Sequence, residues 1–206
     1  MSSRSEPHTR KPRRRLHPTE RREEILDAAV DVLGQHGLSA RVEDITTAAG
    51  TAKGNFYRYF DSVDDLVVAV RDHLLDTYIA ALSERRARNP DADWWTVIED
   101  ETTRFIDFHL DLGPLHDVLF HSGAAEASPP SAERSAGTLI GALLAEASLS
   151  GEVDTTDHEV LGELLFHILH GSTDLIRVGA ERDRVQSELL RFLHRALRPD
   201  HHHPRA

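Results

Sequence analysis

The side chains best suited to contact nucleic acid are concentrated between residues 53 and 59. An asparagine amide pairs with adenine through two hydrogen bonds, and lysine and tyrosine donate to phosphate oxygens. A glycine in the same stretch removes a side chain where a helix would approach the DNA backbone. These residue types therefore predict a DNA contact surface formed by Lys53, Gly54, Asn55, Tyr57 and Tyr59, with Arg58 beside them.

Two short helices are expected to position these side chains. The apolar spacing predicts one helix over residues 42–49 and another over 52–58, joined by a tight turn at Gly50. With an amphipathic helix before them, they form a helix-turn-helix, which places its second helix in the major groove of DNA. The alternative is a packed surface helix whose Phe56 and Phe60 belong to the core.

Helical spacing of apolar residues continues through the rest of the chain, and no alternation of period two indicates a strand. Ser62 is expected to cap the longest helix, with Asp65 at its third position, and Asn89–Pro90 ends it. The sequence therefore predicts an all-α fold of about nine helices. The later helices are expected over residues 93–112, 115–121, 132–148, 156–178 and 182–197, with a loop over 123–130.

Five histidines lie in these later helices, and two of them share a helix face with a carboxylate. His167 and His170 are one helical turn apart, and Asp174 follows His170 by four residues. Such groups ligate zinc, nickel and related metals. Because no cysteine and no defined ligand spacing accompany them, we expect no bound metal and no cofactor, and we keep a metal-responsive protein as an alternative. The other three histidines are His109, His116 and His121.

A pocket of mixed apolar and polar character is the preferred interpretation of the same helices. Phenylalanine rings would form its walls, while a histidine orients a polar group of a bound small molecule. The alternative is that each aromatic side chain is simply part of the core. The predicted ligand-binding residues are Phe105, His109, Phe120, Phe166 and His170.

Charge divides the chain into a basic beginning and an acidic body. Residues 1–60 hold 11 Lys and Arg against 8 Asp and Glu, whereas the 206-residue chain as a whole has a net charge of −11. Two interpretations fit the first 17 residues: an arm that contacts DNA phosphates or a minor groove, or a solvated tail. Such an asymmetry is expected when one end faces phosphate and the other faces solvent or a small molecule.

Several classes of protein are disfavoured by what the sequence lacks. It has no apolar run long enough to span a membrane, no cysteine and no segment typical of a secretory signal, so a cytoplasmic protein without membrane contacts is expected. It also lacks the Gly-x-Ser-x-Gly, phosphate-loop and His-Glu-x-x-His motifs, so we do not expect an enzyme. A helical adaptor that does not bind DNA remains an alternative.

The run VEDITTAAGTAKGNFYRYFDSVDDL, with the Gly-Leu pair that ends the helix before it, resembles the DNA-binding domain of tetracycline-repressor-type (TetR) regulators. The match covers about a quarter of the chain. Arg41 stands where threonine is common in the family and keeps a phosphate partner. Thr51 and Ala52 replace a frequent Val-Ser pair, so Thr51 is expected to substitute for the capping hydroxyl and to contact DNA. Asn55 and Ser62 also depart from the pattern, which leaves the operator sequence open.

The resemblance implies a homodimer that binds a palindromic operator in double-stranded DNA, usually as a repressor released by a small-molecule effector. In this family the last two helices pair with those of the other subunit, so a dimer interface is predicted at Leu161, Leu165, Leu189 and Leu193. We expect a flexible basic arm over 1–17, the helix-turn-helix domain over 18–61, a sensing and dimerisation domain over 62–198 and a flexible tail over 199–206.

Overall fold

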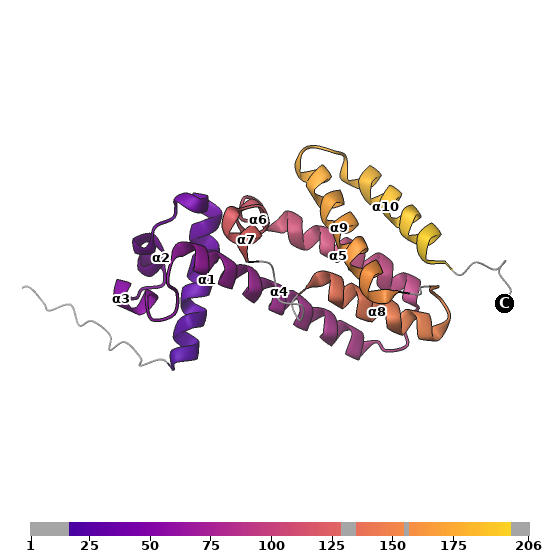
Figure 1. Cartoon of the computed structure of the whole chain (residues 1–206), viewed down its shortest axis with the longest axis horizontal. Helices are drawn as coiled ribbons and strands as arrows, with labels where there is room; N and C mark the ends of the chain where they lie inside the picture. The colour runs from indigo at the N-terminus through magenta and orange to yellow at the C-terminus, as the bar shows by residue number, and fades with distance from the viewer. Residues whose placement is uncertain (1–16, 129–134, 155–156, 199–206) are drawn as a thin grey trace, which may run out of the picture.

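The computed structural model describes residues 17–128, 135–154 and 157–198. Within these residues all regular structure is helical, which confirms the predicted all-α class. The helices from the first sixty residues lie at one end of an elongated molecule, and those from the C-terminal third lie toward the other end (Figure 1). Residues 1–16 of the predicted arm, and the predicted tail, lie outside the described residues.

The N-terminal core is built around two phenylalanine rings. Phe56 and Phe60 are almost fully buried, with ring centroids 5.5 Å apart. They therefore belong to the core. This agrees with the part of the alternative interpretation, a packed surface helix, that assigned Phe56 and Phe60 to the core. The helix before them places five apolar residues at helical spacing against these rings: Ile25, Leu26, Ala29, Val32 and Leu33. The elements are α1 (Pro18–His36), the 3-10 turn η1 (Gly37–Ser39), α2 (Val42–Ala48) and α3 (Lys53–Phe56).

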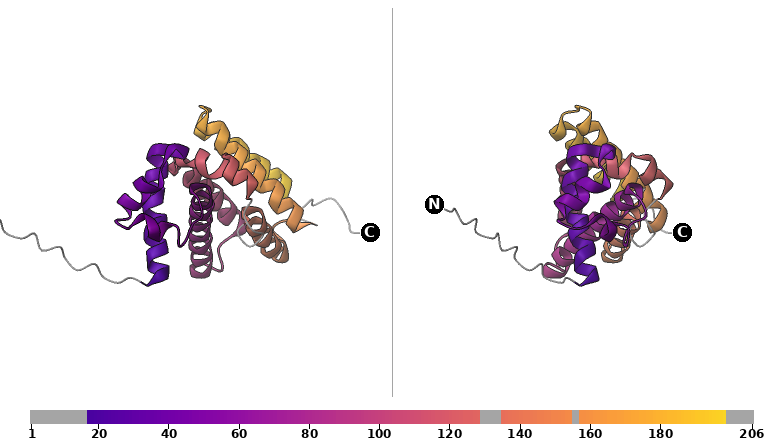
Figure 2. Two further views of the ribbon diagram at one scale, coloured as in Figure 1. Left: turned by 60° about the vertical axis from the view of Figure 1, so that its left-hand side comes forward. Right: turned by 90° about the vertical axis from the view of Figure 1, so that its left-hand side faces the viewer.

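A single long helix, α4 (Val63–Arg88), extends from this core along the length of the molecule (Figures 1 and 2). Its predicted cap is confirmed, because the Ser62 hydroxyl accepts a hydrogen bond of 3.0 Å from the backbone N–H of Asp65. The Asp65 carboxylate in turn accepts from the backbone N–H of Asp61 at 3.1 Å. The helix ends before Asn89, as the Asn-Pro pair predicts.

The C-terminal core is formed by α5 (Trp94–Asp111), α8 (Ala136–Ser150), α9 (His158–Arg177) and α10 (Arg182–Leu197). Apolar residues of all four helices form one buried cluster there. Helices α8 and α9 approach most closely at three buried glycines, Gly137, Gly141 and Gly162, where a side-chain carbon would meet atoms of the facing helix. Asp157 caps α9, accepting from the backbone N–H of Val160 at 3.0 Å.

Two short helices, α6 (Leu115–Phe120) and α7 (Gly123–Ala127), lie between the two cores. The apolar residues Leu115, Val118 and Leu119 of α6 belong to the N-terminal core, although they come from the middle of the chain. The prediction of a loop over 123–130 is wrong for residues 123–127. That segment forms α7 because the Ser122 hydroxyl caps it, accepting from the backbone N–H of Ala125 at 3.3 Å.

Candidate functional site

The turn between α2 and α3 is tight and held by backbone hydrogen bonds. Gly50 has a positive φ of 58°, and the backbone N–H of Thr51 donates to the Thr46 carbonyl at 2.8 Å. The expectation that Thr51 caps α3 is wrong. Its hydroxyl instead accepts a hydrogen bond of 2.8 Å from the Asn55 side-chain amide, and no side chain caps α3.

The predicted DNA-contacting residues lie on one outer end of the molecule, but they are not equally accessible. Lys53 and Gly54 are exposed, and Tyr57 is 51% exposed. Asn55 is half-buried, so reading a base would require it to exchange its hydrogen bond with Thr51. Tyr59 is also half-buried and packs against the N-terminal core. The most accessible predicted contacts are therefore Lys53, Tyr57 and, at the start of α2, Arg41.

The Lys53 ammonium forms an ion pair with the Glu43 carboxylate across the α2–α3 turn. The hydrogen bond between them raises the pKa of Lys53 and lowers that of Glu43, so both groups remain charged near neutral pH. Both side chains are exposed, so the pair is screened by solvent and contributes little to stability. A phosphate can therefore replace the carboxylate as the partner of Lys53.

A cavity of about 700 Å³ lies among α4, α5, α6, α8 and α9. All five predicted ligand-binding residues line it: Phe105, His109, Phe120, Phe166 and His170. His109 is only 1% exposed and lies between aromatic rings, with its centroid 4.4 Å from that of Phe105 and 4.9 Å from that of Phe120. Burial lowers the pKa of His109 to about 2, so this imidazole is neutral at physiological pH.

Several polar residues that line the cavity were not predicted from the sequence, among them Arg71, Glu163 and Tyr78. Arg71 is 2% exposed, and its guanidinium donates to the Ala125 carbonyl at 3.3 Å and to the Asp72 carboxylate at 3.0 Å. Glu163 accepts a hydrogen bond of 2.8 Å from the Ser135 hydroxyl, and Tyr78 also lines the cavity. Arg71 interrupts the apolar stripe of α4. A charged residue at such a position indicates a buried polar contact, and this was the signal in the sequence that could have identified it.

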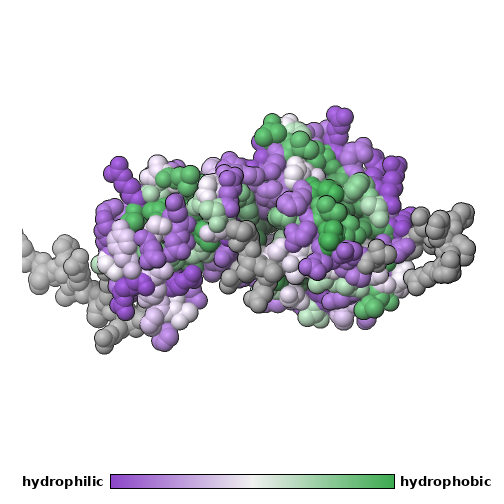
Figure 3. Space-filling view, in the orientation of Figure 1, coloured by the Kyte–Doolittle hydropathy of each residue, from purple (hydrophilic) through white to green (hydrophobic). Residues whose placement is uncertain are grey.

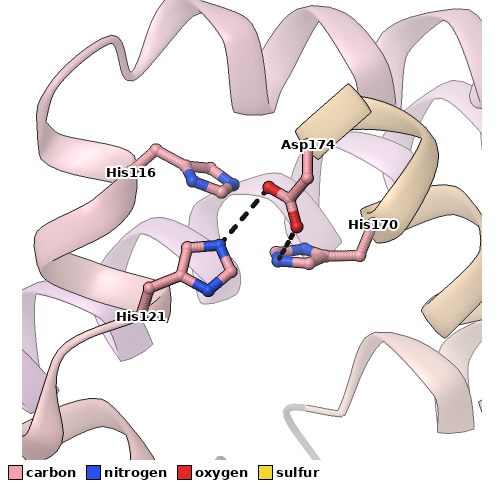
Figure 4. Close-up of side chains that lie close together, drawn as sticks. All are labelled: His116, His121, His170 and Asp174. Carbon is pink, nitrogen blue, oxygen red and sulfur yellow. Dashed lines mark hydrogen bonds and ion pairs between the residues drawn. The ribbon is translucent and has the colours of Figure 1, made fainter. Parts of the chain in front are cut away.

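The histidines are grouped differently from the prediction made on one helix. His170 and Asp174 of α9 lie close to His116 and His121 of α6, whereas His167 is exposed and outside this group (Figure 4). His121 Nε2 lies 3.3 Å from one Asp174 oxygen, and His170 Nε2 lies 3.8 Å from the other. Burial lowers the pKa values of His116 and His170, that of His116 to about 4.

Three of the four predicted dimer-interface residues lie inside the subunit, because Leu165, Leu189 and Leu193 are no more than 5% exposed. The fourth, Leu161, is half-buried and packs against the same cluster. The exposed apolar residues of α9 and α10 are instead Val160, Leu164, Leu175, Val178 and Phe192. Figure 3 shows hydrophobic residues gathered on the face of the molecule where α9 and α10 lie.

These features together describe the architecture: a helix-turn-helix lies at one end, and a long helix joins it to a helical domain that contains a cavity. Residues 25–70 match the sequence model of "Bacterial regulatory proteins, tetR family". This N-terminal segment therefore matches the helix-turn-helix domain of TetR-family transcriptional regulators, as its resemblance to that family indicated.

Curated relatives support this assignment over part of their length. The chain is 38% identical to the regulator YvdT of Bacillus subtilis over 107 residues, which cover 50% of this chain and 52% of YvdT. It is 31% identical to the transcriptional repressor LfrR of Mycolicibacterium smegmatis over 108 residues, covering 52% and 53% of the two chains. The chain thus matches about half the length of these relatives, both of which are named as transcriptional regulators.

Solved structures show that the fold extends over both domains. A TetR-family regulator from Mesorhizobium loti has a TM-score of 0.71 at 14% identity and covers 89% of this chain and 100% of its own. The LfrR structure in complex with proflavine has a TM-score of 0.56 at 23% identity, covering 87% and 98%. Within the described residues, no helix is long and apolar enough to cross a membrane.

Proposed function

We propose that this chain is a cytoplasmic repressor that binds a palindromic operator as a homodimer and is released by a small molecule bound in its cavity. The observation that carries the proposal is the position of α4. Leu66, Val67 and Val70 near its start belong to the N-terminal core. Arg71, which directly follows, and Leu75 and Tyr78 within about two further turns line the cavity.

A ligand that displaces α4 therefore also displaces the helix-turn-helix. In a dimer the two recognition helices must be one DNA turn apart, about 34 Å, to enter successive major grooves. A ligand that binds more tightly to a dimer with another spacing of the recognition helices shifts the population toward that dimer and so lowers operator affinity. The size of the effect is set by the ratio of the ligand's affinities for the two dimer conformations. His109 supports a polar contact in the cavity, because its Nδ1 is buried without a hydrogen-bond partner among the described residues.

The exposed apolar face formed by Val160, Leu164, Leu175, Val178 and Phe192 supports dimerisation. A groove of about 640 Å³ runs between α9 and α10 on this face, with Phe192 and Leu175 in its walls. A contiguous apolar surface of this kind on a soluble domain usually marks an interface. That LfrR was solved with proflavine supports a small organic molecule as the effector for this chain as well.

The test of DNA binding is selection of duplexes from a random library, followed by titration of the selected duplex at several salt concentrations. We expect a palindromic sequence and an affinity that falls steeply with salt, because bound phosphates release counterions. Lys53→Ala should weaken binding to all sequences and reduce the salt slope by about one. Arg191→Ala removes an equally ion-paired, exposed cation from α10 and should leave binding unchanged.

A chain that selects no duplex would contradict the proposal and favour the helical adaptor. For the effector, the selected duplex is titrated with small aromatic compounds, including proflavine, and release is followed by fluorescence anisotropy. Thr138→Trp places a large ring at the cavity wall from an exposed position on α8. It should abolish the response to an active compound while preserving operator affinity. An unchanged response would place the effector outside this cavity.

A further inference from the structure

Three imidazoles and one carboxylate converge where α6 meets α9. His116 and His121 come from α6 and the residue that ends it, and His170 and Asp174 come from α9 (Figure 4). One ligand atom from each of the four residues can be chosen so that all of these atoms lie within 4.8 Å of one another. Residues separated by more than fifty positions in the sequence thus form one compact donor set.

The most buried member of this set lacks hydrogen bonds. His116 is 0% exposed, and neither ring nitrogen has a hydrogen-bond partner among the described residues. Among the residues that the structure describes, the ion-pair contact of His116 is from Nδ1 to the Asp117 carboxylate, at 3.7 Å, which is too long for a hydrogen bond. Nδ1 of His170 is also buried and without a partner. Buried polar atoms without partners are rare in native proteins, and an ion is one explanation for them.

The nearest cation is already neutralised. Arg177 lies on α9 less than one turn beyond Asp174, but its guanidinium pairs with Asp117 at 2.9 Å and donates to the Gly113 carbonyl at 2.8 Å. The Asp174 carboxylate points between His121 and His170 and interacts with both (Figure 4). The group therefore offers three imidazole nitrogens and one carboxylate oxygen as donors for a cation.

We propose that His116, His121, His170 and Asp174 bind a divalent transition-metal ion, with Zn²⁺ as the representative case. Imidazole nitrogens suit Zn²⁺ and similar ions, whereas Mg²⁺ and Ca²⁺ prefer sets made only of oxygen. At Zn–N and Zn–O distances of about 2.1 Å, tetrahedral ligand atoms lie about 3.4 Å apart. The ligand atoms, which lie within 4.8 Å of one another, therefore have to close by at most about 1.4 Å to coordinate one ion.

The site is open to solvent on one side and lies between two helices that a bound ion would link. His121 is 43% exposed, so an ion can enter from solvent, while His116 is inside the protein. Helix α6 packs its other side into the N-terminal core through Leu115 and Leu119. A bound ion would therefore fasten α9 to a helix that belongs to the DNA-binding end. This inference goes beyond effector binding in the cavity, and metal binding can be measured without DNA.

The test is calorimetric titration of the full chain with ZnCl₂ after treatment with a chelator. Three consecutive histidines at positions 201–203 can also bind metal, so the titration is repeated with all three replaced by alanine. We expect one Zn²⁺ per chain to remain in that variant. Removal of a supporting residue around a metal typically costs 10–100-fold in affinity, so loss of a ligand in His121→Ala or Asp174→Asn should cost at least tenfold.

The matched control is His167→Ala, which removes an exposed imidazole from α9 one turn before His170. It should bind Zn²⁺ like the parent chain. His121 is exposed, so His121→Ala should fold normally, and circular dichroism checks this. Co²⁺ should give the visible absorption of a four-coordinate ion, lost in His121→Ala. The proposal is overturned if no ion binds once 201–203 are replaced, if His121→Ala binds normally, or if His167→Ala loses as much affinity.

Discussion

The close contact between α8 and α9 allows a quantitative prediction for Gly162→Ala. A Cβ atom added at Gly162 would lie 2.6 Å from the backbone nitrogen and 2.8 Å from the Cα of Gly141, and nearer still to the Gly137 carbonyl. All three obstacles are backbone atoms, which cannot rotate away as the end of a side chain can. The two helices must therefore separate, or α9 must shift along its neighbour.

The magnitude follows from the size of that displacement. Moving the new carbon from 2.6 Å to an ordinary contact near 3.4 Å requires at least about 0.8 Å of separation between the two helices, and relieving the shorter contact with the Gly137 carbonyl requires more. Overpacking a core costs about 1–3 kcal/mol, and rigid backbone obstacles favour the upper end of this range. Alanine recovers about 1 kcal/mol of helix propensity relative to glycine. We therefore expect a net loss of about 2 kcal/mol, or about 4–8 °C in the midpoint of thermal unfolding.

Thermal unfolding followed by circular dichroism, at one fixed protein concentration, measures the effect. The control is Gly34→Ala in α1, where an added Cβ would meet nothing within 4 Å. Gly34→Ala should be neutral or stabilising by up to about 1 kcal/mol through helix propensity alone. If Gly162→Ala unfolds at the same temperature as Gly34→Ala, the helices are not packed backbone against backbone and the reasoning is wrong.

Three further predictions concern assembly, the buried cation and the metal ion. Leu164→Asp, which places a charge on the exposed apolar face of α9, should shift the chain to a monomer in sedimentation, whereas Leu149→Asp, at a site 90% exposed on α8, should not. Arg71→Ala should lower the free energy of unfolding by about 1–3 kcal/mol in chemical denaturation, since it removes the guanidinium that donates to the buried Ala125 carbonyl. Unchanged stability would show that this hydrogen bond is dispensable. One equivalent of ZnCl₂ should weaken operator binding of the parent chain by at least about fivefold in anisotropy titrations. Operator binding of His121→Ala should not change. An equal effect on both proteins would show that an ion at this site does not control DNA binding.

The helix-turn-helix was predictable because its determinants are local. The turn glycine, the apolar spacing around it and the Ser62 cap act within a few residues of one another, and the structure shows the cap and turn where the sequence indicated them. Five cavity-lining residues were also predicted, since an aromatic residue on the buried face of an amphipathic helix often lines the space that the helices leave, whereas Arg71 and Glu163 were missed.

The dimer face and the histidine group were not predictable in the same way. Helix α9 carries apolar residues on two faces, and helical periodicity does not say which face meets the subunit's own core. Leu165 is buried inside the subunit, whereas its neighbour Leu164 is exposed. The difference arises from the packing of α9 against α8 and α5, which the sequence does not show. The spacing of His167, His170 and Asp174 suggested a site on one helix. Asp174 does lie beside His170, but the other histidines of the group, His116 and His121, come from about fifty residues earlier, and His167 lies outside it.

Helix α6 connects the two ends of the molecule more directly than the order of the domains in the sequence suggests. Its apolar side lies in the N-terminal core with α1 and α4, and its histidine side faces α9. His121 and His170 belong both to the donor set and to the cavity wall. An ion bound there would take two imidazoles away from a ligand in the cavity, so metal and ligand affinities must be linked, and by the same factor in both directions. Because α6 packs into the core of the helix-turn-helix, either occupant acts on the same structural element, and the operator would respond to their combined occupancy.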